Sequence, residues 1–155
     1  MGFRRVSLSK AQSLAEYAPL LPQHLPSGYT LSALAYAASS RPTGEEDGGN
    51  PPSIDVISAA YRRGFDEIVV TTRRTDAYAG SSAADWRDPL QVSTVVSSKP
   101  EQITFTGGAL AGQSGELVLE PDALPHIWTV DPKLVVTIAG TVDRAELLKV
   151  ANSLG

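Results

Sequence analysis

The stretch Ile54–Thr72, IDVISAAYRRGFDEIVVTT, contains two runs rich in β-branched and aromatic residues with a short polar break between them. Ile54–Tyr61 and Phe65–Thr72 are each long enough for a strand, and Arg63-Gly64 between them suits a tight hairpin turn. Strands joined by so short a turn must be antiparallel, because a parallel return needs a crossover of about a dozen residues. This hairpin therefore predicts an antiparallel sheet.

The same reasoning extends the sheet in both directions along the chain. Apolar and polar residues alternate or cluster in further runs of strand length, and Asp131-Pro132 supplies another turn. The expected additional strands are 29–37, 103–106, 116–120, 127–130 and 133–138, and residues 90–96 are a candidate edge strand. We therefore expect about six or seven strands.

Two helices are expected, one near each end. Apolar residues recur at helical spacing between Ser7 and Tyr17, with Ser7 or Ser9 as N-cap and Pro19 beyond the end. Asp143 followed by Glu146 resembles a capping box, and it precedes an amphipathic stripe over about residues 143–153. The predicted fold class is α+β: one domain over residues 1–155, with an antiparallel sheet, a short N-terminal helix, an amphipathic C-terminal helix and mobile loops at about 38–52 and 74–100.

Composition excludes several classes of function. The chain of 155 residues has 13 Lys and Arg against 17 Asp and Glu, so its net charge is −4, and it has no cysteine. The chain therefore lacks the basic surface that nucleic acid requires, and it contains no thiolate ligand or nucleophile. The N-terminus has no apolar run that would make a signal peptide or anchor, and no window suits a membrane-spanning helix. We expect a soluble chain as given.

Two loops resemble ligand sites without meeting their requirements. The acidic loop Glu45–Asn50 offers oxygen ligands, but it lacks the ligand spacing of a helix-loop-helix calcium site and is interpreted as a solvated loop. The glycine-rich stretch Thr106–Gly115 lacks the Gly-Lys-Ser/Thr ending of a phosphate loop and leads into a strand, so a hairpin loop is predicted. Neither a catalytic set, nor a cofactor, nor a metal site is predicted, and we expect a protein that is not an enzyme.

Candidate binding residues lie mainly in the second long loop. Trp86, between charged residues, has the character of an interface anchor, although it could equally fold down and plug the open edge of the sheet. Tyr78, Arg87 and Asp88 complete this tentative site. The two histidines, His24 and His126, adjoin prolines and are interpreted as surface residues at turns, while Trp128 is assigned to sheet packing. His24 is kept as a candidate binding residue.

His24 lies in the stretch Leu20–Leu31, LLPQHLPSGYTL, which we interpret as a rigid connector between helix and sheet. Pro22 and Pro26 restrict the backbone, and Gly28 can take the positive φ that turns the chain into Tyr29. This stretch, the late strand HIWTVDPKLVVTIAG and the closing DRAELLKVANSLG together resemble bacterial extracytoplasmic domains of unknown function. Those domains follow a single transmembrane segment in anti-sigma-factor-like proteins and sporulation lipoproteins. The matching residues are Pro22, Leu25, Pro26, Gly28, Tyr29, Trp128, Glu146, Leu147, Lys149, Ala151, Ser153 and Leu154.

The resemblance implies a location outside the cytoplasm, a sheet related to lipoprotein-carrier (LolA-like) folds, and no catalytic residues. It departs at Asp131-Pro132-Lys133, where the family commonly has Asp-Gly, and in the length of the loop Arg74–Pro100. It also implies contact with a membrane only through a segment that this chain lacks.

Three functions are consistent with these observations. The first is a non-catalytic binding or sensor domain of the cell envelope, whose partner is an envelope protein or a small apolar ligand. The second is a carrier of a lipid or other apolar molecule on a LolA-like curved sheet. The third is a hydrolase, which would need one histidine beside a carboxylate in an open cleft.

Overall fold

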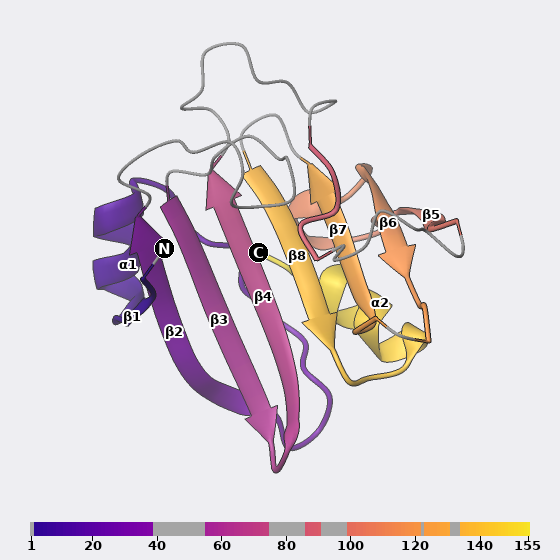
Figure 1. Cartoon of the computed structure of the whole chain (residues 1–155), viewed down its shortest axis with the longest axis horizontal. Coiled ribbons are helices and arrows are strands. Elements are labelled where there is room, and N and C mark those ends of the chain that lie inside the picture. Colours follow the sequence, from indigo (N-terminus) through magenta and orange to yellow (C-terminus); the bar gives the residue numbers. More distant parts are fainter. Residues whose placement is uncertain (1, 39–54, 75–85, 91–98, 122, 131–133) are drawn as a thin grey trace.

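A computed structural model describes residues 2–38, 55–74, 86–90, 99–121, 123–130 and 134–155. Within them lie an eight-stranded antiparallel sheet and two helices, in agreement with the predicted α+β class (Figure 1). The elements are β1 (Arg4–Arg5), α1 (Leu8–Ala15), β2 (Thr30–Ala38), β3 (Asp55–Arg63), β4 (Asp66–Arg74), β5 (Glu101–Thr104), a 3₁₀ turn (Gly108–Leu110), β6 (Ser114–Val118), β7 (His126–Val130), β8 (Leu134–Gly140) and α2 (Arg144–Ala151). Among the described residues, neither helix is long and apolar enough to cross a membrane.

The sheet is built from two meanders that meet at its centre. The strand order is β1-β2-β3-β4-β8-β7-β6-β5, so the first four strands run inward from one edge and the last four from the other. The hairpin of β3 and β4 turns at Gly64, whose φ is +60°, as its sequence predicts. The eighth strand is β1, which pairs with β2 and which the sequence did not predict.

Both helices have the N-caps that the sequence indicates. The Ser7 hydroxyl accepts a hydrogen bond from the Lys10 amide at 3.3 Å, and Asp143 Oδ1 accepts one from the Glu146 amide at 2.8 Å. The stripe on α2 is fully buried, as expected, and consists of Leu147, Val150, Ala151 and the following Leu154.

Both helices cover the same face of the sheet. Helix α1 packs on β2 and β3, and α2 packs on β7 and β8. The main core lies between the helices and alternate residues of the strands, because successive side chains of a strand point to opposite faces. Its strand residues include Leu34, Ile57, Val70, Ile138 and Ile127.

The connector before β2 pairs with the C-terminus of the chain. Gly28 has a φ of +86°, as expected for its turn into the buried Tyr29. In addition, the Leu21 amide and carbonyl each hydrogen bond to Gly155, and the Gln23 amide donates to the Ser153 carbonyl at 3.0 Å. The connector is therefore fixed near its start by hydrogen bonds to the C-terminus and at its end by the burial of Tyr29. The sequence did not predict the hydrogen bonds.

Candidate functional site

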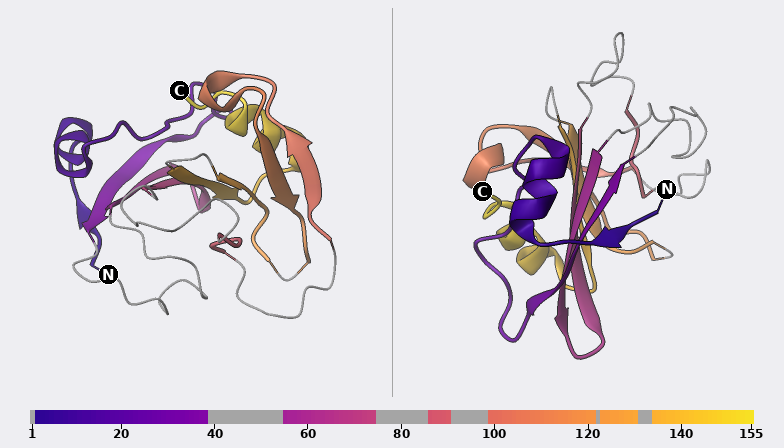
Figure 2. Two further views of the ribbon diagram at one scale, coloured as in Figure 1. Left: turned by 90° about the horizontal axis from the view of Figure 1, so that it is seen from above. Right: turned by 90° about the vertical axis from the view of Figure 1, so that its left-hand side faces the viewer.

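In the described parts of the chain, no helix covers the second face of the sheet, and the side chains on this face are mostly small. We call it the helix-free face (Figure 2). Strand register places two rows of side chains across it from β2 to β7. The first row is Ala35, Ser58, Thr71, Thr137 and Trp128, and the second is Ala33, Ala60, Val69, Ala139 and His126.

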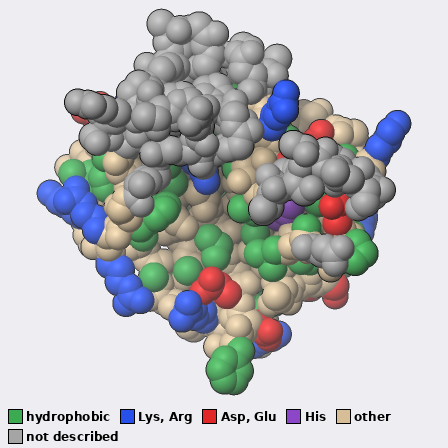
Figure 3. All heavy atoms as spheres, viewed as in Figure 1, with side chains coloured by type: hydrophobic (Ala, Val, Ile, Leu, Met, Phe, Trp, Pro, Cys, Tyr) green, Lys and Arg blue, Asp and Glu red, His purple; other side chains and the backbone are tan. Residues whose placement is uncertain are grey.

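Exposure differs between the two halves of this face. On β2, β3 and β4 the small side chains are only partly buried, whereas on β8 Thr137 and Ala139 are buried. Hydrophobic side chains are scattered among other side chains and backbone over the visible part of this face (Figure 3). The β2–β4 half is therefore an accessible surface of short side chains.

The β7 end of the face carries an aromatic residue with a fixed orientation. The Trp128 indole N–H donates to Glu116 Oε2 at 3.0 Å, and Gln102 donates to Glu116 Oε1 at 3.0 Å. The ring is only partly buried. Trp128 thus has sheet neighbours, as expected, and also contributes an ordered aromatic surface beside Thr137.

Residues 86–90, which we call the strap, lie over the helix-free face in front of β7 and β8 (Figure 1). The sheet curves around the side that carries the strap, while both helices lie on the outer side (Figure 2). Asp88 Oδ1 accepts a hydrogen bond from the Leu90 amide at 2.9 Å, and Oδ2 lies 2.7 Å from His126 Nε2. Oδ1 therefore forms a turn within the strap, and Oδ2 connects the strap to β7.

His126 is buried between two hydrogen-bond acceptors. Its Nε2 faces Asp88, and its Nδ1 lies 2.6 Å from the Leu124 carbonyl oxygen. A neutral imidazole has one donor nitrogen, so with Asp88 as a carboxylate the two acceptors are both satisfied only by the doubly protonated ring. Burial alone would lower the pKa of His126, but the contacts with Asp88 and Leu124 and the charges of Asp88 and Glu120 raise it above its usual value.

The expectation that His126 lies at the surface was wrong. Only 1% of the residue is exposed, because His126 belongs to β7 as its first residue and its ring lies between the Leu124 carbonyl and Asp88 of the strap. Its neighbours across the strands on the same face are Val118 and Ala139, both apolar.

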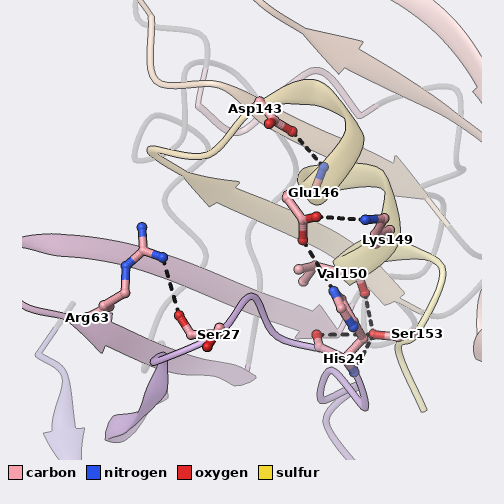
Figure 4. A network of polar contacts seen from close by, with 8 residues as sticks. All are labelled: His24, Ser27, Arg63, Asp143, Glu146, Lys149, Val150 and Ser153. Carbon is pink, nitrogen blue, oxygen red and sulfur yellow. Dashed lines mark hydrogen bonds and ion pairs between the residues drawn. The ribbon is translucent and has the colours of Figure 1, made fainter.

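His24 lies elsewhere, beside α2 (Figure 4). Its side chain is 44% exposed, as expected for a surface histidine, and its Nε2 lies 3.3 Å from Glu146 Oε2. Glu146 also pairs with Lys149 at 2.7 Å, and these two partners lower the pKa of Glu146, Lys149 first. Ser153 Oγ accepts a hydrogen bond from the His24 amide at 3.0 Å, so the network ties the connector to α2.

A second buried carboxylate links the first three long strands to α1. Asp55 accepts a hydrogen bond from the Tyr36 hydroxyl at 2.7 Å and lies 3.1 Å from Arg74. Burial, followed by the hydrogen bond and charge of Asp55, raises the pKa of Tyr36 to about 12. Arg74 also donates to the Ala15 carbonyl at the end of α1, so this cluster joins elements of the core.

The structure brings together only part of the predicted binding site. Trp86 is buried, which agrees with the interpretation that it packs onto the sheet and not with an exposed interface anchor. Asp88 contacts His126. Arg87 is exposed, and Tyr78 lies outside the described residues, as do the acidic loop 45–50, the turn at Asp131-Pro132 and most of the candidate strand 90–96. Sequence reasoning missed His126 as the partner of Asp88. Alternation within β7 was the one signal that placed His126 on the same face as Trp128.

In the parts of the chain that the structure describes, no three His, Asp or Glu side chains gather as a metal site would require. The chain has no significant match among protein-family models, curated proteins or solved structures.

Proposed function

We propose that the protein is a non-catalytic binding domain of the bacterial cell envelope and that the helix-free face is its binding surface. The observation that carries this proposal is the partial exposure of the small apolar residues Ala33, Ala35, Ala60 and Val69 at the inner curve of the sheet. The partner is an envelope protein or a small apolar ligand.

The side chains of this face differ from those of an ordinary solvated sheet face. An antiparallel sheet with one face in water usually shows polar residues there. Here Ala60 and Val69 pair across β3 and β4, and the hydroxyls of Ser58 and Thr71 lie 3.3 Å apart and can satisfy each other. Short side chains on a curved sheet leave room for a ligand, and binding sites combine apolar walls with a few polar groups.

The histidines support a binding role over a catalytic one. A general base needs a free lone pair within reach of substrate. Both ring nitrogens of His126 face acceptors inside the fold, and the His24 ring lies on the α2 side beside Glu146 and Lys149. The exposed pair of His24 and Glu146 supplies the histidine and carboxylate that the hydrolase alternative requires, but it lies on the α2 side, away from the helix-free face.

The envelope location rests on the resemblance to extracytoplasmic domains. The predicted motif residues occupy structural positions: Gly28 has positive φ, and Leu147, Ala151 and Leu154 are buried under the sheet. Because these residues have structural roles, the motif supports a fold shared with those domains more than an activity shared with them.

Two matched variants test the binding surface. Ala60→Arg places a long cation at the centre of the helix-free face, whereas Ala145→Arg makes the same change at an exposed position of α2. The probe is 1-N-phenylnaphthylamine, an uncharged fluorescent molecule. We expect the wild type and Ala145→Arg to bind it with equal affinity and Ala60→Arg to lose binding while its circular dichroism spectrum is unchanged. Equal binding by all three proteins would refute this surface.

The carrier function is the second candidate, because the curvature of the sheet would let an apolar chain lie along the short side chains (Figure 2). A carrier is expected to keep its cargo through purification. Native mass spectrometry of the protein from a bacterial host tests this: a discrete added mass that is lost in Ala60→Arg supports the carrier. A bare mass, with probe binding intact, favours a sensor or partner-binding role.

A further inference from the structure

We propose that the protonation state of His126 controls access to the helix-free face: the imidazolium holds the strap over β7 and β8, and loss of its proton releases the strap. The effect on ligand binding rests on the proposed function, whereas the movement of the strap does not.

The geometry makes the contact depend on the proton. At 2.7 Å from the Asp88 carboxylate and 2.6 Å from the Leu124 carbonyl, both ring nitrogens must donate. In a neutral ring, one of the two nitrogens carries a lone pair instead of a proton. That lone pair would face an oxygen acceptor, so the ring could no longer stay between Asp88 and the Leu124 carbonyl. The attraction between opposite charges at the Asp88 contact disappears at the same time.

Two carboxylates near the His126 ring, those of Asp88 and Glu120, favour its positive charge. Asp88 comes from the strap, and Glu120 comes from the segment after β6. Val118 on β6 and Ala139 on β8, which flank the ring across the strands, are uncharged. These contacts raise the pKa of His126, so release is expected above the pH at which an ordinary histidine titrates.

Release of the strap would uncover the part of the face that is now buried. Trp86 in the strap is only 5% exposed, and Thr137 and Ala139 on β8 are also buried. In the described part of the chain, the Thr137 hydroxyl has no hydrogen-bond partner. An open strap would present this hydroxyl next to Trp128, and so would extend the accessible surface from β4 to β7.

Tryptophan fluorescence tests the movement, because the chain has only two tryptophans. In a Trp128→Phe background, the emission reports on Trp86 alone. We expect emission typical of a buried indole at acidic pH, with a single shift to longer wavelength and severalfold stronger quenching by acrylamide as pH rises above the ordinary histidine pKa. Adding His24→Gln, the matched control, should leave this transition unchanged. Adding Asp88→Asn should reverse its direction, because the introduced amide pairs with the neutral ring and not with the imidazolium, so that Trp86 is more readily quenched at acidic pH.

A wild-type Trp86 signal that stays constant with pH, or a transition that keeps its direction and amplitude in Asp88→Asn, would contradict the pH-dependent release of the strap. A parallel titration with 1-N-phenylnaphthylamine separates the strap from the proposed function. A Trp86 transition without any probe binding supports the strap and counts against the helix-free face as binding surface. Probe binding that is lost in Ala60→Arg, without a Trp86 transition, supports that surface and counts against the strap.

Discussion

Replacing Asp88 by asparagine should destabilise the protein at acidic pH and have little effect at alkaline pH. In the wild type, Asp88 accepts hydrogen bonds from both Leu90 and the His126 ring. An asparagine can keep the bond from the Leu90 amide through its oxygen, but its NH₂ group then points at His126 Nε2. That contact suits a neutral ring, whose Nδ1–H still donates to the Leu124 carbonyl.

The magnitude follows from the two protonation states. Losing a buried hydrogen bond to a charged group costs about 1.5–3 kcal/mol. In the variant, folding at about pH 5.5 also requires removal of a proton from a histidine of ordinary pKa near 6.5, which costs about 1.4 kcal/mol. The free energy of unfolding should therefore fall by about 3–4 kcal/mol at about pH 5.5.

The contribution of His126 to stability depends on pH in the direction opposite to that of a paired carboxylate, whose contribution is lost as pH falls. The pKa of His126 is raised in the folded state, so the stability that its proton contributes is fully present below the unfolded pKa and is lost as pH rises through the folded pKa. At an alkaline pH above the raised folded pKa of His126, the wild type no longer benefits from the charged pair, and the difference between the two proteins should shrink to less than about 1 kcal/mol.

Urea unfolding followed by far-UV circular dichroism at the two pH values measures this difference. Glu146→Gln is the control, because it removes the contact between His24 and a carboxylate, which is exposed to solvent and is expected to contribute little at either pH. An equal loss of stability for Asp88→Asn at both pH values, or a larger loss at the alkaline one, would refute the assignment of His126 as a buried imidazolium.

Three further predictions concern the fold and are measured by urea unfolding near neutral pH. Gly108→Ala should destabilise the protein far more than Gly112→Ala: both have positive φ, which costs about 1–2 kcal/mol, but only at Gly108 would a Cβ clash with the backbone oxygen of Leu154. Equal losses would contradict this packing. Asp143→Ala should cost about 1 kcal/mol through the lost N-cap of α2, and no loss would argue against the cap. Tyr36→Phe leaves the buried Asp55 one hydrogen bond short and should cost about 1–3 kcal/mol. A neutral effect would show that water replaces the hydroxyl.

Local patterns in the sequence predicted the parts of the fold that depend on neighbouring residues. The hairpin at Gly64 and the buried stripe of α2 after Asp143 follow from turn chemistry and periodicity within a few residues. Strand β1 has only two residues, Arg4 and Arg5, and forms by pairing with β2 rather than by any pattern of its own. The pairing of β4 with β8 is equally non-local, so the sequence indicated antiparallel strands but not their order.

The candidate site was predicted only in part for the same reason. Asp88 and His126 are 38 positions apart, and they meet because the strap crosses the sheet. The proline before His126 suggested a turn, but a proline is also tolerated immediately before a strand begins. For Trp86 the sequence left two interpretations open, and its burial agrees with the one in which the ring folds down onto the sheet.

Chemical-shift mapping by NMR tests the central claim most directly, namely that the helix-free face is the binding surface. Addition of 1-N-phenylnaphthylamine to the ¹⁵N,¹³C-labelled protein should shift the methyl signals of Ala35, Ala60 and Val69, and leave those of Leu147 and Val150 under α2 unchanged. Shifts concentrated in the α2 core, or no shifts under conditions where the probe binds, would contradict the account.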